Sequence, residues 1–298
     1  MALLAWWLWR ASPLTPNPAA TAPASTPAAA EASGAPAAPT APTVQEAKTA
    51  SGQAIRLVRR PRLAAPEPPY GPAYAQLLPA AQAGDSTAQY RLGLLLYECR
   101  DVPEDQLALD RQVENVYATR SRNGWDVDDP AAEEQSLRRH HDECAGVPQD
   151  ARGAYRDWLR KAADAGLLEA QLDLPLHLPD AKYCQYLADC TPQQRKLQES
   201  LDAEAVDYLS RARDAGSATA LWTLGSWYAE GDVLPQNNIE AYAYFSALDQ
   251  VFGAAGDSRR FDAILADLRY RLRPIDLTQA QARSRELLAN PNCCVLPP

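Results

Sequence analysis

The chain has 298 residues, of which 46% are apolar and 22% are charged, and this length suffices for one large domain or two ordinary ones. Its 29 basic and 38 acidic residues give a net charge of −9, so nucleic acid is not expected as the main partner, because phosphates need a basic face. Only three histidines occur, which leaves little room for a histidine-rich metal site or a Ser-His-Asp triad.

Residues 1–10, MALLAWWLWR, form an apolar N-terminus that is closed by one arginine. The run is too short to span a bilayer, and it lacks the basic start of a signal peptide. Three tryptophans in four positions favour a membrane, because tryptophan prefers the bilayer interface. We expect the remnant of a membrane anchor or signal whose true start lies upstream; the alternative is an accidental apolar N-terminus.

Residues 11–69 are expected to form a disordered Ala/Pro-rich linker with a basic end. Within 11–45, 29 of the 35 residues are Ala, Pro, Ser or Thr, so the stretch cannot bury enough surface to offset its chain entropy. Residues 55–62, IRLVRRPR, bring the charge of residues 1–65 to +4, against −13 for residues 66–298. These arginines are interpreted either as a solvated linker end docked on the acidic domain or as a contact with anionic lipid headgroups.

The dipeptide Ala-Gly recurs at 83–84, 165–166 and 215–216 with the same residue types around each copy. Such offsets lie on one helix face, and a glycine between them is typical of a helix end in the left-handed conformation. Each copy is therefore predicted to be a helix, a glycine turn and a second helix. Leucine stands seven residues before and eight after each glycine, and alanine four before and four after: Leu77, Leu159, Leu209; Leu92, Leu174, Leu224; Ala80, Ala162, Ala212; Ala88, Ala170, Ala220.

A single helix pair of this kind cannot bury its apolar face, whereas stacked pairs can. We therefore expect an all-α fold, an α-solenoid of stacked antiparallel helix pairs over residues 70–298. Gly84 and Gly166 are 82 residues apart but Gly166 and Gly216 only 50, so the first repeat should contain an insertion at about 106–142. Pro175 should shorten its helix, and residues 257–289 should form a diverged helical cap.

Residues 143–166 resemble the Sel-one-like repeat, a relative of the tetratricopeptide repeat. The resemblance rests on GVPQD at 146–150, on Trp158 and on the pair Ala162-Ala163, while residues 216–248 match a whole repeat more loosely. It implies an α-solenoid of bacterial type with a scaffold or adaptor role, sometimes in envelope stress or secretion.

Six cysteines suggest disulfides if the protein is exported. Cys99 and Cys144 precede similar Val-Pro turns and bracket the insertion, so we expect them to be bonded to each other. Cys184 and Cys190 can meet if a helix ends after them, and they form the second expected pair. The state of the adjacent Cys293 and Cys294 is left open. Zinc binding is the alternative to disulfide formation, although the sequence has no C-x2-C spacing of the kind common in zinc sites.

Signatures of catalysis are missing: the sequence has no Gly-Lys pair for a phosphate loop, no G-x-S-x-G and no H-E-x-x-H. His140 and Cys144 could hold a metal on one helix face, but a polar helix end beside a disulfide is the preferred interpretation. We predict no catalytic, cofactor or metal site. Tyr97 and Trp227 do not stand at positions that are shared among the repeats, so they need not serve the packing between repeats. We predict that they anchor a peptide if they line the concave face, because aromatic residues dominate binding hot spots.

These patterns together predict a non-enzymatic protein- or peptide-binding scaffold of the bacterial cell envelope. It would face the periplasm, tethered to the inner membrane only through its N-terminus, and its acidic domain would favour a basic partner. Two other classes stay open: a metal- or redox-active cysteine protein, and a structural module that binds cell-wall polymer. The oligomeric state is left open.

Overall fold

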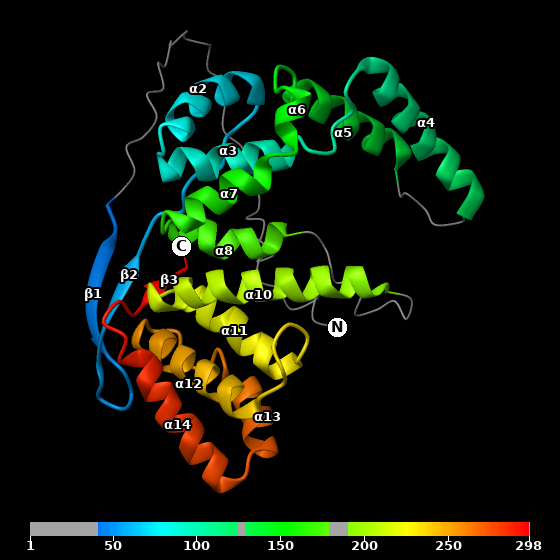
Figure 1. The fold of residues 1–298 in the computed structure, drawn as a ribbon. Coiled ribbons are helices and arrows are strands. Elements are labelled where there is room, and N and C mark those ends of the chain that lie inside the picture. The colour runs from blue at the N-terminus through cyan, green and yellow to red at the C-terminus, as the bar shows by residue number, and fades with distance from the viewer. Residues whose placement is uncertain (1–40, 124–128, 179–189, 298) are drawn as a thin grey trace, which may run out of the picture. The chain divides into compact units, whose positions relative to one another are not determined.

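The fold is mostly helical over residues 41–123, 129–178 and 190–297, which the computed structural model describes (Figure 1). Successive helices pack as antiparallel pairs, and the pairs stack on one another, which confirms the predicted all-α solenoid. The helices are α2 (Tyr70–Gln82), α3 (Ser86–Glu98), α4 (Gln106–Asn123), α5 (Pro130–Glu143), α6 (Gln149–Arg152), α7 (Tyr155–Asp164), α8 (Leu168–His177), α10 (Pro192–Asp214), α11 (Ala218–Glu230), α12 (Asn238–Ala254), α13 (Asp262–Arg271) and α14 (Pro274–Leu288).

A glycine in the left-handed conformation ends the first helix of each predicted pair, with φ of 95° at Gly84, 86° at Gly166 and 91° at Gly216. In each turn the glycine N–H donates to the carbonyl three residues back, and the next N–H donates to the carbonyl five residues back. The predicted helix–glycine–helix unit is thus confirmed in all three copies. The same turn follows α12 at Gly256, where Ala255-Gly256 repeats the dipeptide without its flanking leucines.

The repeat positions form the interior of the stack. Eleven of the twelve flanking leucines and alanines are buried, because the faces that carry them meet between neighbouring helices. Ala80 is the exception and is exposed. It lies on α2, the first helix of the stack, so no earlier helix covers it.

The packed interior divides into two clusters of buried side chains. The N-terminal core is built from α2, α3, α7 and α8, with Tyr208 added from α10, and Ala151 of α6 packs against it. The C-terminal core is built from α10 to α14 and three short strands, with Leu168 added from α8. Since α8 and α10 each lend a side chain to the other's core, these two helices join the two halves of the solenoid.

A small sheet lies against the C-terminal core, which the sequence did not predict. β1 (Thr43–Lys48) and β2 (Ala54–Arg59) form an antiparallel hairpin, and β2 also pairs in parallel with β3 (Val295–Leu296). Ile55 and Leu57 are 5% and 2% exposed. The expected disordered linker over 11–69 is therefore wrong for residues 43–59, because β2 buries an apolar face and finds a strand partner at the other end of the chain.

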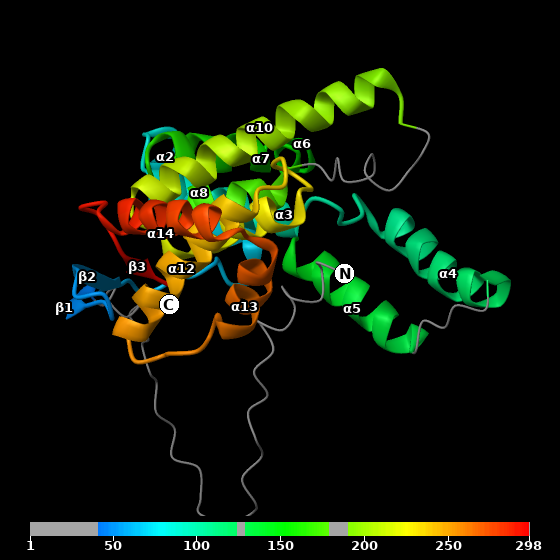
Figure 2. The same cartoon turned by 90° about the horizontal axis from the view of Figure 1, so that it is seen from below.

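The predicted insertion at 106–142 coincides with α4 and α5, which lie side by side in both views (Figures 1 and 2) and are called the arm below. Helix α8 ends two residues after Pro175, as expected for a helix shortened by proline. The expected C-terminal cap is made by α13 and α14. In the described ranges, no helix combines the length and the apolar character needed to cross a bilayer.

Candidate functional site

The base of the arm is closed by the predicted disulfide. Cys99 follows α3 and Cys144 follows α5, and their sulfur atoms are 2.03 Å apart with a Cα–Cα distance of 5.7 Å. Both residues are fully buried in the N-terminal core. The chain therefore leaves the solenoid at Cys99 and returns to it at Cys144.

A buried arginine makes a second tie at the same place. Arg152 on α6 is 8% exposed, and its guanidinium donates to the carbonyls of Val102 (2.9 Å) and Val147 (3.1 Å). These two valines occupy matching positions in the turns that follow Cys99 and Cys144. Burial lowers the pKa of Arg152. Arg152 was not identified as a site residue from the sequence. The Val-Pro turn that follows each of the two cysteines was the pattern that could have pointed to it.

Within the arm, Arg138 of α5 joins the two helices. Its guanidinium donates to Glu134 on α5 (2.9 Å) and to Asp110 on α4 (3.1 Å), and the Tyr117 hydroxyl of α4 donates to Glu134 (2.9 Å). Hydrogen bonds from Gln106 and then Arg138 lower the pKa of Asp110, and those from Arg138 and then Tyr117 lower the pKa of Glu134. Both carboxylates are therefore ionised at neutral pH.

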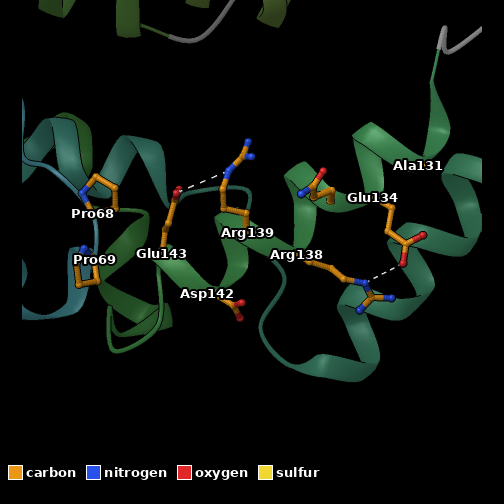
Figure 3. Close-up of a pocket in the computed structure, with 9 residues that line it drawn as sticks. Pro68, Pro69, Ala131, Glu134, Arg138, Arg139, Asp142 and Glu143 are labelled. Atoms are coloured by element: carbon orange, nitrogen blue, oxygen red, sulfur yellow. Dashed lines mark hydrogen bonds and ion pairs between the residues drawn. The ribbon is translucent and has the colours of Figure 1, made fainter. Parts of the chain in front are cut away.

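An open groove of about 840 Å³ lies between the arm and the start of α2 (Figure 3). We call it the α5 groove. Its far wall is fixed by Gly71, because a Cβ on this residue would overlap the carbonyl of Ala145, the residue after Cys144. The lining residues are Pro68, Pro69, Ala131, Glu134, Gln135, Arg138, Arg139, Asp142 and Glu143.

The lining of the groove carries three carboxylates and two arginines, and the sequence of the arm as a whole is acidic. Residues 106–143 contain five arginines and nine acidic residues. Arg138 is engaged inside the arm, and Arg139 contacts Glu143 only at 3.8 Å. The side chain of Asp142 is 86% exposed. A cationic side chain entering the groove would compete with Arg139 for Glu143, at 3.8 Å, and with His141 for Asp142, at 3.7 Å.

The two predicted peptide anchors lie apart from this groove and from each other. Tyr97 packs on the N-terminal core. The centroid of its ring lies 5.4 Å from that of Tyr155 and 4.2 Å from that of His177, and the Arg100 guanidinium carbon lies 3.6 Å from the same centroid. Trp227 packs on the C-terminal core. The structure does not bring Tyr97 and Trp227 together, and their role in binding stays a prediction.

Three further cysteines of the described residues are also in disulfides. Cys293 and Cys294 are paired with each other, and Cys190 is disulfide-bonded, while Cys184 lies outside the described residues. With its sulfur in a disulfide, Cys144 offers no thiolate to the metal site considered for His140 and Cys144. In the described part of the chain, no three His, Cys, Asp or Glu residues are grouped as a metal site would require.

Neither a protein-family model nor a curated protein matches this chain. Among solved structures, the chain is similar to c5321, described as a protective antigen present in uropathogenic Escherichia coli strains displaying an SLR fold. The two are 19% identical with a TM-score of 0.26, and the match covers 74% of this chain and 49% of the other. This chain thus spans about half the length of that protein.

Proposed function

We propose that this chain is a non-enzymatic scaffold of the bacterial cell envelope that binds a basic segment of another protein in the α5 groove. The observation that carries this proposal is the open groove itself, where three carboxylates of α5 stand beside two arginines and the base of the arm is held by the Cys99–Cys144 disulfide and by Arg152. A site that is fixed before its partner arrives loses less conformational entropy on binding.

The chemistry of the groove favours arginine and lysine side chains. Asp142 and Glu143 would accept charge-assisted hydrogen bonds from a guanidinium or an ammonium group, which are stronger than neutral ones. Pro68 and Pro69 supply an apolar wall, against which the aliphatic stem of such a side chain can pack. A basic segment would thus find both of the contacts that it needs.

Two further observations support the envelope and the scaffold role. Disulfides persist in oxidising compartments, and the oxidised Cys99–Cys144 pair fits the periplasmic side of the envelope. The resemblance of residues 143–166 to Sel-one-like repeats supports an adaptor rather than an enzyme. The apolar, tryptophan-rich residues 1–10 support a tether to the inner membrane.

The test is capture of partners from unreduced envelope extracts of the native host by the full chain, followed by affinity measurements with a synthetic peptide from the captured protein. We expect a peptide rich in lysine or arginine, and we expect the D142N/E143Q variant to bind it about tenfold more weakly. The E114Q/E133Q variant removes the same charge from the arm outside the groove, and it should bind like the native chain. Equal binding by all three chains, or no captured protein, would refute the proposal.

A further inference from the structure

Four arginines on and after β2 are exposed and make no ion pair or side-chain hydrogen bond within the described residues. We call Arg56, Arg59, Arg60 and Arg62 the arginine strip. Some arginines of the helices, such as Arg138 and Arg160, are by contrast paired with carboxylates, whereas Arg195, Arg269 and Arg285 share the exposed, unpaired state of the strip. Ion pairs therefore do not hold the strip on the acidic domain, although the charge of Arg62 acts on Tyr90 of α3, and both interpretations of this basic segment stay predictions.

Two arginines of the strip, Arg56 and Arg59, lie on a fixed support, and Arg60 and Arg62 follow it in the chain. β2 lies between β1 and β3, and its Ile55 and Leu57 are buried in the C-terminal core. Residues 43–62 carry five basic residues and one acidic residue, Glu46, which stands opposite Arg56 in the β1–β2 register. Residues 43–62 thus carry a local charge of +4, of which the hairpin itself supplies +2, whereas residues 66–298 carry −13.

We infer that the arginine strip docks the folded domain on the surface of an anionic phospholipid bilayer. A guanidinium matches a phosphate group with two parallel hydrogen bonds, and each basic residue near an anionic membrane strengthens binding severalfold. Acidic side chains that lie more than about 8 Å from the membrane surface would oppose this contact only weakly, because they are screened at physiological salt. Val44 of β1, which is 54% exposed, stands opposite Val58 in the register and adds an apolar contact.

The position of the strip in the chain favours a membrane over a nucleic acid. The hairpin is the first described element after the tryptophan-rich residues 1–10 and the Ala/Pro-rich spacer, so it is the part of the domain nearest in sequence to the expected tether. A long nucleic acid would run past the strip onto acidic surface, whereas a bilayer can meet the strip alone. Nucleic-acid binding is therefore an outcome that the test must detect.

The test is co-sedimentation of the full chain with phosphatidylglycerol vesicles and with phosphatidylcholine vesicles. We expect tighter binding to the anionic vesicles, weakened by salt, and a loss of this preference by about tenfold or more in the R56Q/R59Q/R60Q/R62Q variant. The apolar N-terminus is present in every chain, so its contribution cancels in the ratio of the two vesicle types.

The control removes four exposed arginines elsewhere, in the R195Q/R259Q/R269Q/R285Q variant, and it should keep the preference. A variant with lysine at all four strip positions should keep most of the preference for anionic vesicles, because the positive charges remain. Its binding would also show that the domain still folds when these four positions are changed. An unchanged preference in the strip variant, or an equal loss in the control, would overturn the inference. Strip-dependent retention of a DNA duplex without a preference for anionic vesicles would also overturn it.

Discussion

At the scale of single residues, Gly216 and Gly84 form a matched pair, because both turns have the same left-handed backbone. A Cβ on Gly84 would meet nothing, whereas a Cβ on Gly216 would overlap the carbonyl of Asn292. We expect Gly84→Ala to cost roughly 1 kcal/mol for the backbone conformation alone. Gly216→Ala should cost about 3 kcal/mol, because the C-terminal tail must also move. Urea unfolding of both variants measures the difference, and equal losses would contradict the close contact.

Asp249 gives a residue-scale prediction that depends on pH. It is half-buried on α12 without an ion pair or hydrogen bond to any described residue, and burial, followed by the charge of Asp262, raises its pKa. A raised pKa means that the folded chain binds this proton more tightly, so its contribution to stability is present at low pH and is lost as the pH rises through the folded pKa.

Asp249→Asn should therefore raise the Tm at neutral pH, where the native carboxylate is ionised. It should leave the Tm almost unchanged below the ordinary aspartate pKa of about 3.9, where both side chains are neutral. Thermal unfolding followed by circular dichroism at the two pH values checks this. A gain of the same size at both values would show that the charge is not the cause.

At the scale of elements, the arm depends on its base. The Cys99–Cys144 bond spans 45 residues of sequence, and closing a loop of this length stabilises a fold by about 4 kcal/mol in the chain-entropy model. We expect the C99S/C144S variant to lose roughly that much stability and its arm, residues 106–143, to become the first site of proteolysis. A loss below about 1 kcal/mol would mean that Arg152 holds the two turns without the disulfide.

The elements differ in how far the sequence could predict them. The helix turns at Gly84, Gly166 and Gly216 were predictable, because a helix end is a local event written in a few neighbouring residues. The Cys99–Cys144 bond was predictable because both cysteines precede similar turns. The hairpin at 43–59 was not predictable, since β2 pairs with β3 from the far end of the chain. A local sequence pattern does not indicate a pairing between such distant segments.

The candidate site was harder to predict than the fold. Its two walls, Pro68-Pro69 and α5, are separated by more than 60 residues, and only the close approach permitted by Gly71 brings them together. The aromatic residues chosen as anchors, Tyr97 and Trp227, were selected by their phase on a helix. Phase indicates which face a side chain takes, but it does not show that the two residues pack on separate cores.

At the scale of the whole folded domain, the two ends of the described chain stabilise each other. The side chains of Asn290 and Asn292 donate to the carbonyls that end α10, at Arg213 and Asp214, with distances of 3.0–3.1 Å. The backbone N–H of Val295 donates to the carbonyl of Gly216, and the backbone of Cys294 is hydrogen-bonded to β2. The tail thus caps a helix, completes the sheet and fills the C-terminal core, whereas the N-terminal core contains none of its residues.

Removal of residues 290–298 should therefore act on one half of the domain. We expect backbone amides of the 43–59 hairpin and of the end of α10 to lose protection, because their partners and the cover over Ile55 are gone. Amides of α3 and α7 should keep their protection, since these helices pack in the N-terminal core. Hydrogen exchange with mass spectrometry reads both regions in one experiment. Uniform loss over all helices would show that the two cores unfold as one unit, and an unchanged hairpin would show that β1 and β2 need no third strand.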